Sequence, residues 1–230
     1  MTTPLHIGLL LFPDVTQLDL TGPFEVFART PGVVCHLIWK EIKPVRSDRG
    51  LMLVPDCTFD NCPPLDVICV PGGPGQIALM SDEETLSFLR RQAQHAQFIT
   101  SVCTGSLVLG AAGLLHGYRA TSHWSSRDQL ALLGAEPVEA RVVRDRNRLT
   151  GAGVTSGIDF ALTLVAEIRG NDVAQAIQLQ MEYDPEPPFH AGSPQSATPE
   201  QLTTARSQMA DFIATRRRAT ERAAQHLSRD

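Results

Sequence analysis

The stretch FITSVCTGSLVLGAAG, residues 98–113, changes its period in the middle and decides the fold class of the chain. Residues 98–102 are a short apolar run typical of a buried strand, and residues 104–113 are small and apolar, as in a helix packed closely on a sheet. Cys103 lies at the junction. A strand that turns sharply into a helix presents its corner side chain above the sheet, as the serine of G-x-S-x-G hydrolases is presented.

Cys103 is therefore a candidate nucleophile. Most cysteines flanked by apolar residues are inert members of the core. A cysteine that only fills the core has no reason to lie at a sharp turn between a strand and a helix. The N-terminus of a helix favours negative charge, so this position favours the thiolate over the thiol. We predict that Cys103 reacts as a nucleophile with a lowered pKa.

The composition indicates a globular protein with a substantial core. The chain has 230 residues, 43% of them hydrophobic, which fits one large domain with at most a small appendage. Its net charge of -5 argues against nucleic acid or an anionic membrane as the main partner. No apolar run reaches membrane-spanning length, and the N-terminal residues lack the basic region of a signal peptide. Five cysteines without a framework predict free thiols in a reducing cytoplasm.

Apolar runs alternate with helical patterns along the chain. Strands are expected at residues 5–12, 33–40, 66–70, 98–102, 117–123 and 138–144, and helices at residues 21–28, 81–94, 104–113, 125–133, 158–168, 171–181 and 200–226. The alternation predicts an α/β fold, a three-layer sandwich with a mostly parallel central sheet. In the last helix, Met209, Phe212 and Ile213 form an apolar patch in the first half, and the Arg-rich second half is expected to face solvent.

Four loops are expected at the carboxyl ends of strands, where such folds bind ligands: residues 13–20, 71–76, 103–106 and 151–156. Asp19 ends the first loop, just before a helix predicted to start at Thr21. Taken alone, Asp19 is better explained as a helix cap. Placed near Cys103 and partly desolvated, its carboxyl group could instead exchange a proton with the thiol.

Other candidate groups carry weaker signals. His123 could be the base of a Cys–His pair, but we favour a histidine at the edge of the core with a backbone partner. Cys57 and Cys62 lack an accompanying second pair, and no two histidines have ligand spacing, so no metal site is predicted. The glycine-rich loops at residues 71–75 and 151–157 lack the ending of a phosphate-binding loop.

Five motifs in combination resemble the DJ-1/PfpI superfamily: LLFPDVTQLDLTGPFEVF, DVICVPGGPG, TSVCTGSLVLGAAGLL, TSHW and LTGAGVTSGIDFAL. The resemblance runs from residue 5 to about residue 195, and within the superfamily it is strongest to the isocyanide hydratase branch. It implies a flavodoxin-like domain over residues 1–195, with residues 196–230 as a helical extension packed on the same domain. It also implies a homodimer, and it implies no metal or organic cofactor.

The resemblance further implies a reaction and a set of site residues. An isocyanide would be hydrated to an N-substituted formamide through a thioimidate on Cys103, with Asp19 as general acid and base. Thr104 would lie beside the substrate. The loop with Gly72 and Gly73 would supply backbone donors, and the loop with Gly151, Gly153 and Val154 would pack over the thiol.

The sequence departs from other branches of the superfamily. PfpI-type peptidases have a histidine directly after the cysteine, where this chain has Thr104. The regulator branch adds a DNA-binding domain, for which the 41 residues after the YDPEPPF segment at residues 183–189 are too few. Three alternatives stay open: a DJ-1-like oxidative-stress thiol sensor or chaperone, a glyoxalase-type cysteine hydrolase, and a regulator that kept its ligand domain.

Overall fold

A parallel sheet forms the centre of the molecule in the computed structural model, which describes residues 4–228. Its strands are β1 (Leu5–Leu10), β2 (Val33–Trp39), β5 (Cys57–Thr58), β6 (Val67–Val70), β7 (Phe98–Val102), β10 (Val142–Asp145) and β11 (Arg148–Gly151). Their order is β10-β11-β7-β6-β1-β2-β5, and every pair is parallel except β10 with β11. Strands β2-β1-β6-β7-β11 thus follow the flavodoxin-like order.

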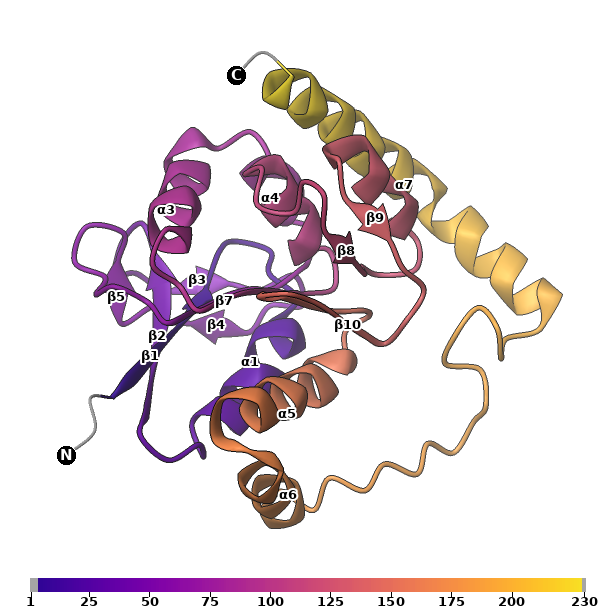
Figure 1. Ribbon diagram of the computed structural model, residues 1–230. Coiled ribbons are helices and arrows are strands. Elements are labelled where there is room, and N and C mark those ends of the chain that lie inside the picture. The colour runs from indigo at the N-terminus through magenta and orange to yellow at the C-terminus, as the bar shows by residue number, and fades with distance from the viewer. Residues whose placement is uncertain (1–3, 229–230) are drawn as a thin grey trace.

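Helices cover both faces of this sheet (Figure 1). One face carries α1 (Gln17–Phe27), α5 (Ser156–Arg169) and α6 (Asn171–Gln180). The other carries α2 (Gln76–Leu79), α3 (Glu83–Ala93), α4 (Gly105–Ala111) and the 3-10 helix η1 (Arg127–Leu133). The central strands β6 and β7 are almost wholly buried because both of their faces are covered. The predicted three-layer α/β sandwich with a mostly parallel sheet is confirmed.

Several predicted elements differ from the observed ones. The first helix begins at Gln17 rather than at Thr21, so Asp19 lies within its first turn instead of in a loop, and Pro23 lies inside it. The strand expected at 117–123 shrinks to β8 (Arg119–Ala120), which pairs with β9 (Glu136–Pro137). The polar region before β6 holds the small ladder of β3 (Val45–Arg46) and β4 (Met52–Leu53). Short two-residue pairings such as these leave no periodic pattern in a sequence.

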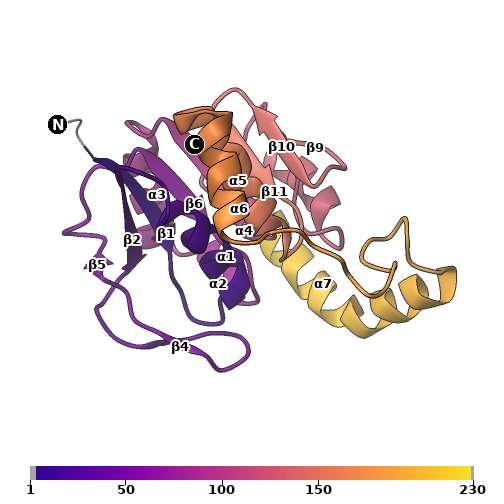
Figure 2. The same ribbon diagram turned by 90° about the horizontal axis from the view of Figure 1, so that it is seen from below.

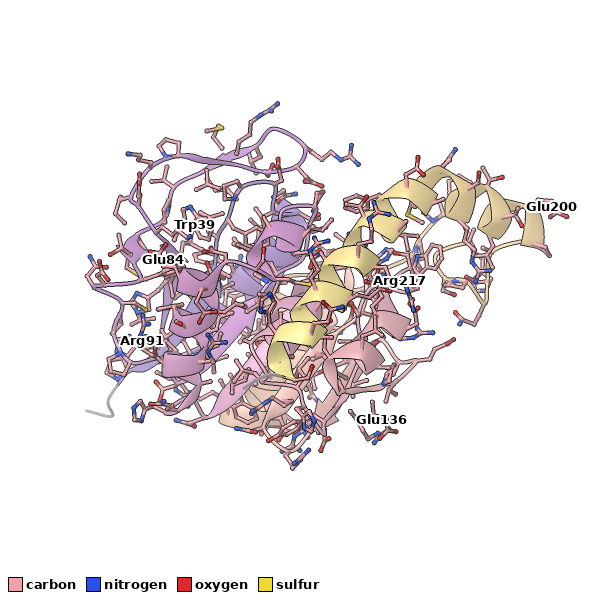
Figure 3. All side chains as sticks on the ribbon, turned by 90° about the horizontal axis from the view of Figure 1, so that it is seen from above. Trp39, Glu84, Arg91, Glu136, Glu200 and Arg217 are labelled. Atoms are coloured by element: carbon pink, nitrogen blue, oxygen red, sulfur yellow. The ribbon has the colours of Figure 1, made fainter. Side chains whose placement is uncertain are left out.

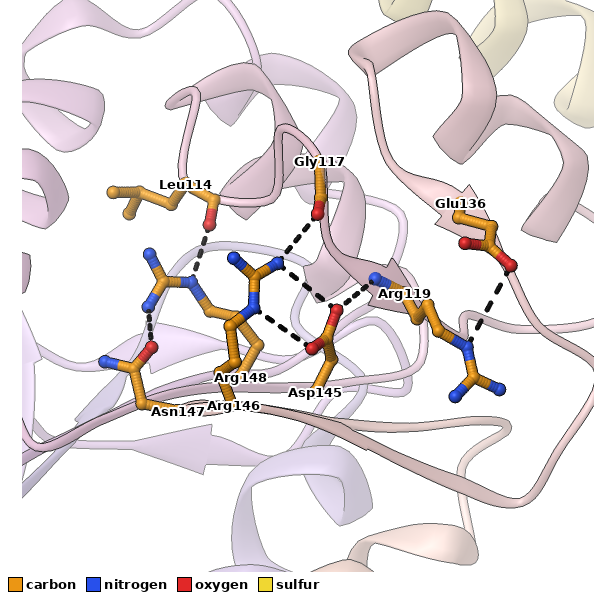
Figure 4. Close-up of polar contacts among 8 residues, drawn as sticks. All are labelled: Leu114, Gly117, Arg119, Glu136, Asp145, Arg146, Asn147 and Arg148. Carbon is orange, nitrogen blue, oxygen red and sulfur yellow. Dashed lines mark hydrogen bonds and ion pairs between the residues drawn. The ribbon is translucent and has the colours of Figure 1, made fainter.

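Two arginines fix the β10–β11 hairpin to the rest of the fold (Figure 4). Arg146 Nη2 donates to the carbonyl of Gly117 at 2.7 Å, and Arg148 Nε donates to the carbonyl of Leu114 at 2.7 Å. Both guanidinium groups also lie over the ring of Tyr118, with Cζ at 3.5 and 4.3 Å from its centroid. The hairpin is therefore held firmly, and its carboxyl end at Gly151 points toward the end of β7.

Helix α7 (Pro199–Leu227) begins with a capping box, in which Thr198 and Gln201 bond to each other's backbone N–H. Its first half projects from the body of the molecule (Figure 2), and Figure 3 shows Glu200 at that far end and Arg217 over the body. The second half packs against α4, η1 and α2. No helix within residues 4–228 is long and apolar enough to cross a membrane.

The expectation that the second half of α7 faces solvent is wrong. Arg216, Ala219, Thr220 and Ala223 are buried, and they recur at the spacing of one helix face. The other arginines of this half, Arg217, Arg218 and Arg222, are exposed, and Arg217 pairs with the carboxylates of Asp128 and Glu221. The high arginine content of this half led to the prediction of a solvent-exposed segment, although one face of the helix consists of small buried residues and one buried arginine.

Candidate active site

Cys103 occupies a sharp corner between β7 and α4. Its φ angle is +56°, a left-handed conformation that is strained for a residue with a side chain. Its N–H donates to the carbonyl of Gly151 at 3.0 Å, and its own carbonyl accepts from the hydroxyls of Ser106 at 3.1 Å and Ser122 at 3.0 Å. These bonds from three segments hold the strained corner in place. The geometry is that of a nucleophile elbow.

Gly105 allows this corner to lie against the neighbouring strand. A Cβ atom at this position would lie 2.0 Å from the carbonyl oxygen of Val70 at the end of β6. Any side chain would push α4 away from the sheet and move the thiol with it. The glycine two residues after the cysteine is thus required by a close approach of two backbones.

Asp19 is fully buried in the first turn of α1. Its Oδ2 accepts from the N–H of Gly72 at 3.0 Å, while Oδ1 has no hydrogen-bond partner among residues 4–228. Burial raises the pKa of Asp19 to about 7, although hydrogen bonds from the Cys103 side chain and from Gly72 oppose the rise. At neutral pH this carboxyl group can therefore be found with or without its proton.

The pKa of the Cys103 thiol differs from our sequence-based prediction. Burial raises this pKa well above its ordinary value, and the charge of Asp19 raises it further, whereas the Thr104 N–H and the Arg216 guanidinium lower it. The helix N-terminus is present as predicted, but desolvation and a neighbouring carboxylate outweigh it. Because the Asp19 charge opposes the thiolate, a thiolate forms most readily when Asp19 is protonated.

The loop after β6 packs directly against this pair. A Cβ at Gly72 would lie 2.6 Å from the Thr104 nitrogen and 2.8 Å from Asp19 Oδ2. The N–H of Gly72 bonds to Asp19, and the N–H of Gly73 bonds to Thr104 Oγ1 at 3.3 Å. The sequence analysis expected this loop to supply backbone donors to the substrate. In the structure both N–H groups bond within the protein, so the loop orients Asp19 and Thr104 instead.

The loop after β11 brings its three predicted residues to the same end of the sheet. The carbonyl of Gly151 accepts the hydrogen bond from the Cys103 N–H. A Cβ on Gly153 would lie 3.5 Å from the His123 ring, and Val154 lines the pocket described below. His123 Nδ1 lies 2.8 Å from the Ser125 hydroxyl, and burial together with the charge of Arg216 lowers its pKa to about 4. A neutral histidine bonded to a neighbouring serine fits the structural role that we favoured over a catalytic base.

A pocket of about 610 Å³ opens above Cys103. Its wall includes Thr104, His123 and Val154, and also residues that the sequence analysis did not assign to the site: Thr16, Asp48, Arg49, Met209, Phe212 and Arg216. The last three come from α7, so the C-terminal helix forms one wall of the pocket. The sequence analysis grouped Met209 and Phe212 in an apolar patch, but it did not include Arg216 or predict where this helix face lies.

Arg216 is the most unusual residue of this wall. It is 4% exposed, and within residues 4–228 it has no carboxylate partner. Its Nη1 donates to the Ser126 hydroxyl at 2.8 Å, and its Cζ lies 4.4 Å from the centroid of the Phe212 ring. A buried guanidinium without a counter-ion favours negative charge nearby, and it lowers the pKa of Cys103.

The fold and the site together define a flavodoxin-like α/β protein with a cysteine nucleophile elbow and a buried carboxyl group beside the thiol. The model of the DJ-1/PfpI family matches residues 6–167, and the chain belongs to this family.

Known relatives agree with that assignment. An isonitrile hydratase of Pseudomonas putida is 58% identical over 97% of this chain and 98% of its own length. The regulator GbdR of Pseudomonas aeruginosa is 32% identical, but the match covers 79% of this chain and 51% of the regulator. The crystal structure of a ThiJ/PfpI family protein from Pseudomonas syringae superposes with a TM-score of 0.93 at 49% identity, covering 95% of this chain and 91% of that one.

Proposed function

We propose that this protein is an isocyanide hydratase, which adds water to an isocyanide to give an N-substituted formamide. The observation that carries the proposal is the likeness, along almost the whole of both chains, to an isonitrile hydratase. Cys103 lines a pocket and has the buried Asp19 carboxyl group as a neighbour, which supports the proposal because the reaction needs a soft nucleophile and a group that gives and takes protons.

The first half of the proposed reaction forms a covalent intermediate. The Cys103 thiol gives its proton to Asp19, and Sγ attacks the terminal carbon of the isocyanide. Asp19 then delivers the proton to that same carbon. The product is a thioimidate, in which the former isocyanide carbon carries one hydrogen, the sulfur and a double bond to nitrogen.

The second half releases the product. A water molecule attacks the thioimidate carbon while Asp19 accepts one of its protons and passes it to the nitrogen. The resulting tetrahedral carbon carries hydroxyl, sulfur, hydrogen and amine nitrogen. Its collapse forms the carbonyl of the formamide, breaks the carbon–sulfur bond and returns the hydroxyl proton to Cys103. An Asp19 pKa near 7 supports both roles, since a group that titrates near the working pH can give and take protons.

We infer three further properties of the protein. Residues 1–195 and 196–230 form one folding unit, because α7 supplies a wall of the pocket. The protein works in the cytoplasm, a reducing compartment that suits five cysteines, all in the described part of the chain and none in a disulfide. It assembles as a homodimer, in which the partly exposed Met209 and Phe212 of α7 gain cover.

The proposal is tested by following formamide production from an aryl isocyanide in water labelled with heavy oxygen, beside an assay with methylglyoxal. We expect the label in the formamide carbonyl, no comparable turnover of methylglyoxal, and complete loss of activity in Cys103→Ala. Cys35→Ala is the matched control and should retain activity, because Cys35 is a half-buried thiol of β2 outside the pocket. Turnover of methylglyoxal alone would instead support a glyoxalase-type hydrolase.

A further inference from the structure

A second group of reactive side chains lies at the far edge of the sheet. His36 of β2, Asp56 and Cys57 of β5 offer three ligand atoms that all lie within 4.8 Å of one another. The thiol of Cys62, which lies near that of Cys57, donates to the carbonyl of Pro63 at 3.4 Å. Strand β5 is four strands away from β7 and Cys103, so this group is separate from the pocket. We propose that His36, Asp56, Cys57 and Cys62 form a binding site for a tetrahedral divalent transition metal, with zinc as the fitting ion.

Strand pairing brings these residues together. The sequence analysis set zinc aside because Cys57 and Cys62 had no second pair of ligands. The parallel pairing of β2 with β5, in which Ile38 lies opposite Cys57, supplies that second pair as His36 and Asp56. Two thiols, one imidazole and one carboxylate are donors that zinc takes in closed, four-coordinate sites.

Asp56 is held so that one of its oxygens stays available. Its Oδ2 accepts from the N–H of Leu37 at 3.1 Å, and its own N–H donates to the Leu37 carbonyl at 2.8 Å. Oδ1 is left 3.9 Å from Nδ1 of His36. Tetrahedral zinc with bonds of about 2.0–2.3 Å needs ligand atoms roughly 3.5 Å apart, so small side-chain rotations are enough to close the site.

His6 orients the imidazole ligand. Nδ1 of His6 lies 2.9 Å from Nε2 of His36, and the two rings stack with centroids 5.2 Å apart. Metal-binding histidines characteristically hydrogen-bond through the nitrogen that does not face the metal, and this bond fixes the tautomer and the ring. Here the bond to His6 leaves Nδ1 of His36, the atom nearer Asp56, for the ion.

The site would stabilise an exposed edge of the sheet. Strand β5 has two residues and is the last strand on its side. A metal ion would tie it to β2 and to the turn that carries Cys62. An ion that binds the folded state and not the unfolded one raises the free energy of unfolding, and the gain grows with the logarithm of the ion concentration divided by its dissociation constant.

The test uses full-length protein with Cys103→Ala, so that the active-site thiol cannot bind metal, reduced and stripped of metal. Zinc titration against a coloured chelator should give one ion per chain, and cobalt should give the thiolate charge-transfer and tetrahedral bands of a sulfur-ligated site. Cys57→Ser and Asp56→Asn should each weaken zinc binding at least tenfold. His6→Phe should weaken it by about tenfold to a hundredfold, as is typical for loss of a residue that orients a ligand.

Cys35→Ser in the same background is the matched control, because Cys35 lies beside His36 on β2 but is not among the proposed ligands. It should bind zinc as the parent does. Equal zinc affinity in Cys57→Ser and the parent, or a cobalt spectrum without the thiolate band, would overturn the site. Asp56 is more than half exposed in its side chain, so Asp56→Asn keeps the test decisive even if Cys57→Ser does not fold.

Discussion

At the scale of single residues, the sequence predicted positions better than it predicted protonation. The corner at Cys103 follows from its own strand-to-helix pattern, and the position of Asp19 beside it was proposed from motifs that the sequence displays. The direction of the Cys103 pKa does not follow from the sequence, because it depends on complete burial and on the distance to a carboxyl group in another element. Arg216 was missed for the same reason, since nothing local distinguishes it from the exposed arginines beside it.

The effect of Arg216 on the thiol can be measured directly. Arg216→Met removes the buried positive charge, so the midpoint of the Cys103 alkylation rate against pH should move to higher pH, and the rate at neutral pH should fall. Arg216→Lys, which keeps the charge, should restore much of the difference. Arg217→Met is the matched control, because Arg217 is an exposed neighbour paired with Asp128 and Glu221. An unchanged midpoint in Arg216→Met would refute the role.

Asp19 should also give stability a defined pH dependence. Its pKa is 3.8 in the ordinary state and about 7 when folded, so between about pH 4 and pH 7 the folded chain holds a proton that the unfolded chain has released. Rising pH therefore favours unfolding over this window, and the penalty is constant above it. A shift of about three pKa units corresponds to roughly 4 kcal/mol at most.

Urea unfolding of the wild type and Asp19→Asn tests this dependence. The stability of Asp19→Asn relative to wild type should increase from about pH 4 to pH 7 and then level off. The exposed carboxyl of Asp60 provides the control variant Asp60→Asn, which should follow the wild type. A difference between wild type and Asp19→Asn that does not change with pH would show that Asp19 ionises in the folded state as it does in water.

At the scale of elements, the long periodic segments were predicted well and the short or tertiary-dependent ones were not. The buried runs of β1, β6 and β7 and the helical pattern of α5 carry their own signal. We expected helix α1 to begin near Thr21, because proline is usual in the first turn of a helix. The helix begins at Gln17 instead, and Pro23 lies in its interior, where α1 packs against α5. The buried stripe of α7 could not be predicted from the sequence, because it is set by the face of the helix that packs against α4 and η1.

The contribution of α7 to the pocket predicts a change in substrate binding. Phe212→Ala removes an aromatic wall and should raise KM for an aryl isocyanide by about tenfold, with a smaller effect on kcat, because the contact binds ground state and transition state alike. Phe189→Ala is the control, since Phe189 is 81% exposed and lies outside the pocket wall. Unchanged steady-state kinetics in Phe212→Ala would show that α7 does not contact the substrate.

At the scale of the whole molecule, the strand order explains why the site lies where it does. Loops after β1, β6, β7 and β11 meet at the carboxyl edge of the sheet, where the chain order reverses between β1 and β6. The sequence predicted this meeting of four loops because alternating strands and helices imply parallel strands. It could not predict that a helix about a hundred residues beyond Cys103 closes the pocket.

The proposed homodimer belongs to this scale. Sedimentation velocity at micromolar concentration should give a single species of twice the chain mass, which dissociates on dilution only at much lower concentration. A monomer at micromolar concentration would contradict the assembly, and the apolar patch on α7 would then need another explanation.

The central claim is that Asp19 moves protons for a nucleophilic Cys103. It is tested most directly by measuring formamide production from an aryl isocyanide in wild type, Asp19→Asn and Asp19→Glu, together with alkylation of Cys103 in each. Asp19→Asn should lose at least about a hundredfold in turnover while Cys103 remains open to alkylation. Asp19→Glu should keep partial activity, because one added methylene misplaces the carboxyl group in a packed site. Full turnover in Asp19→Asn would contradict the account.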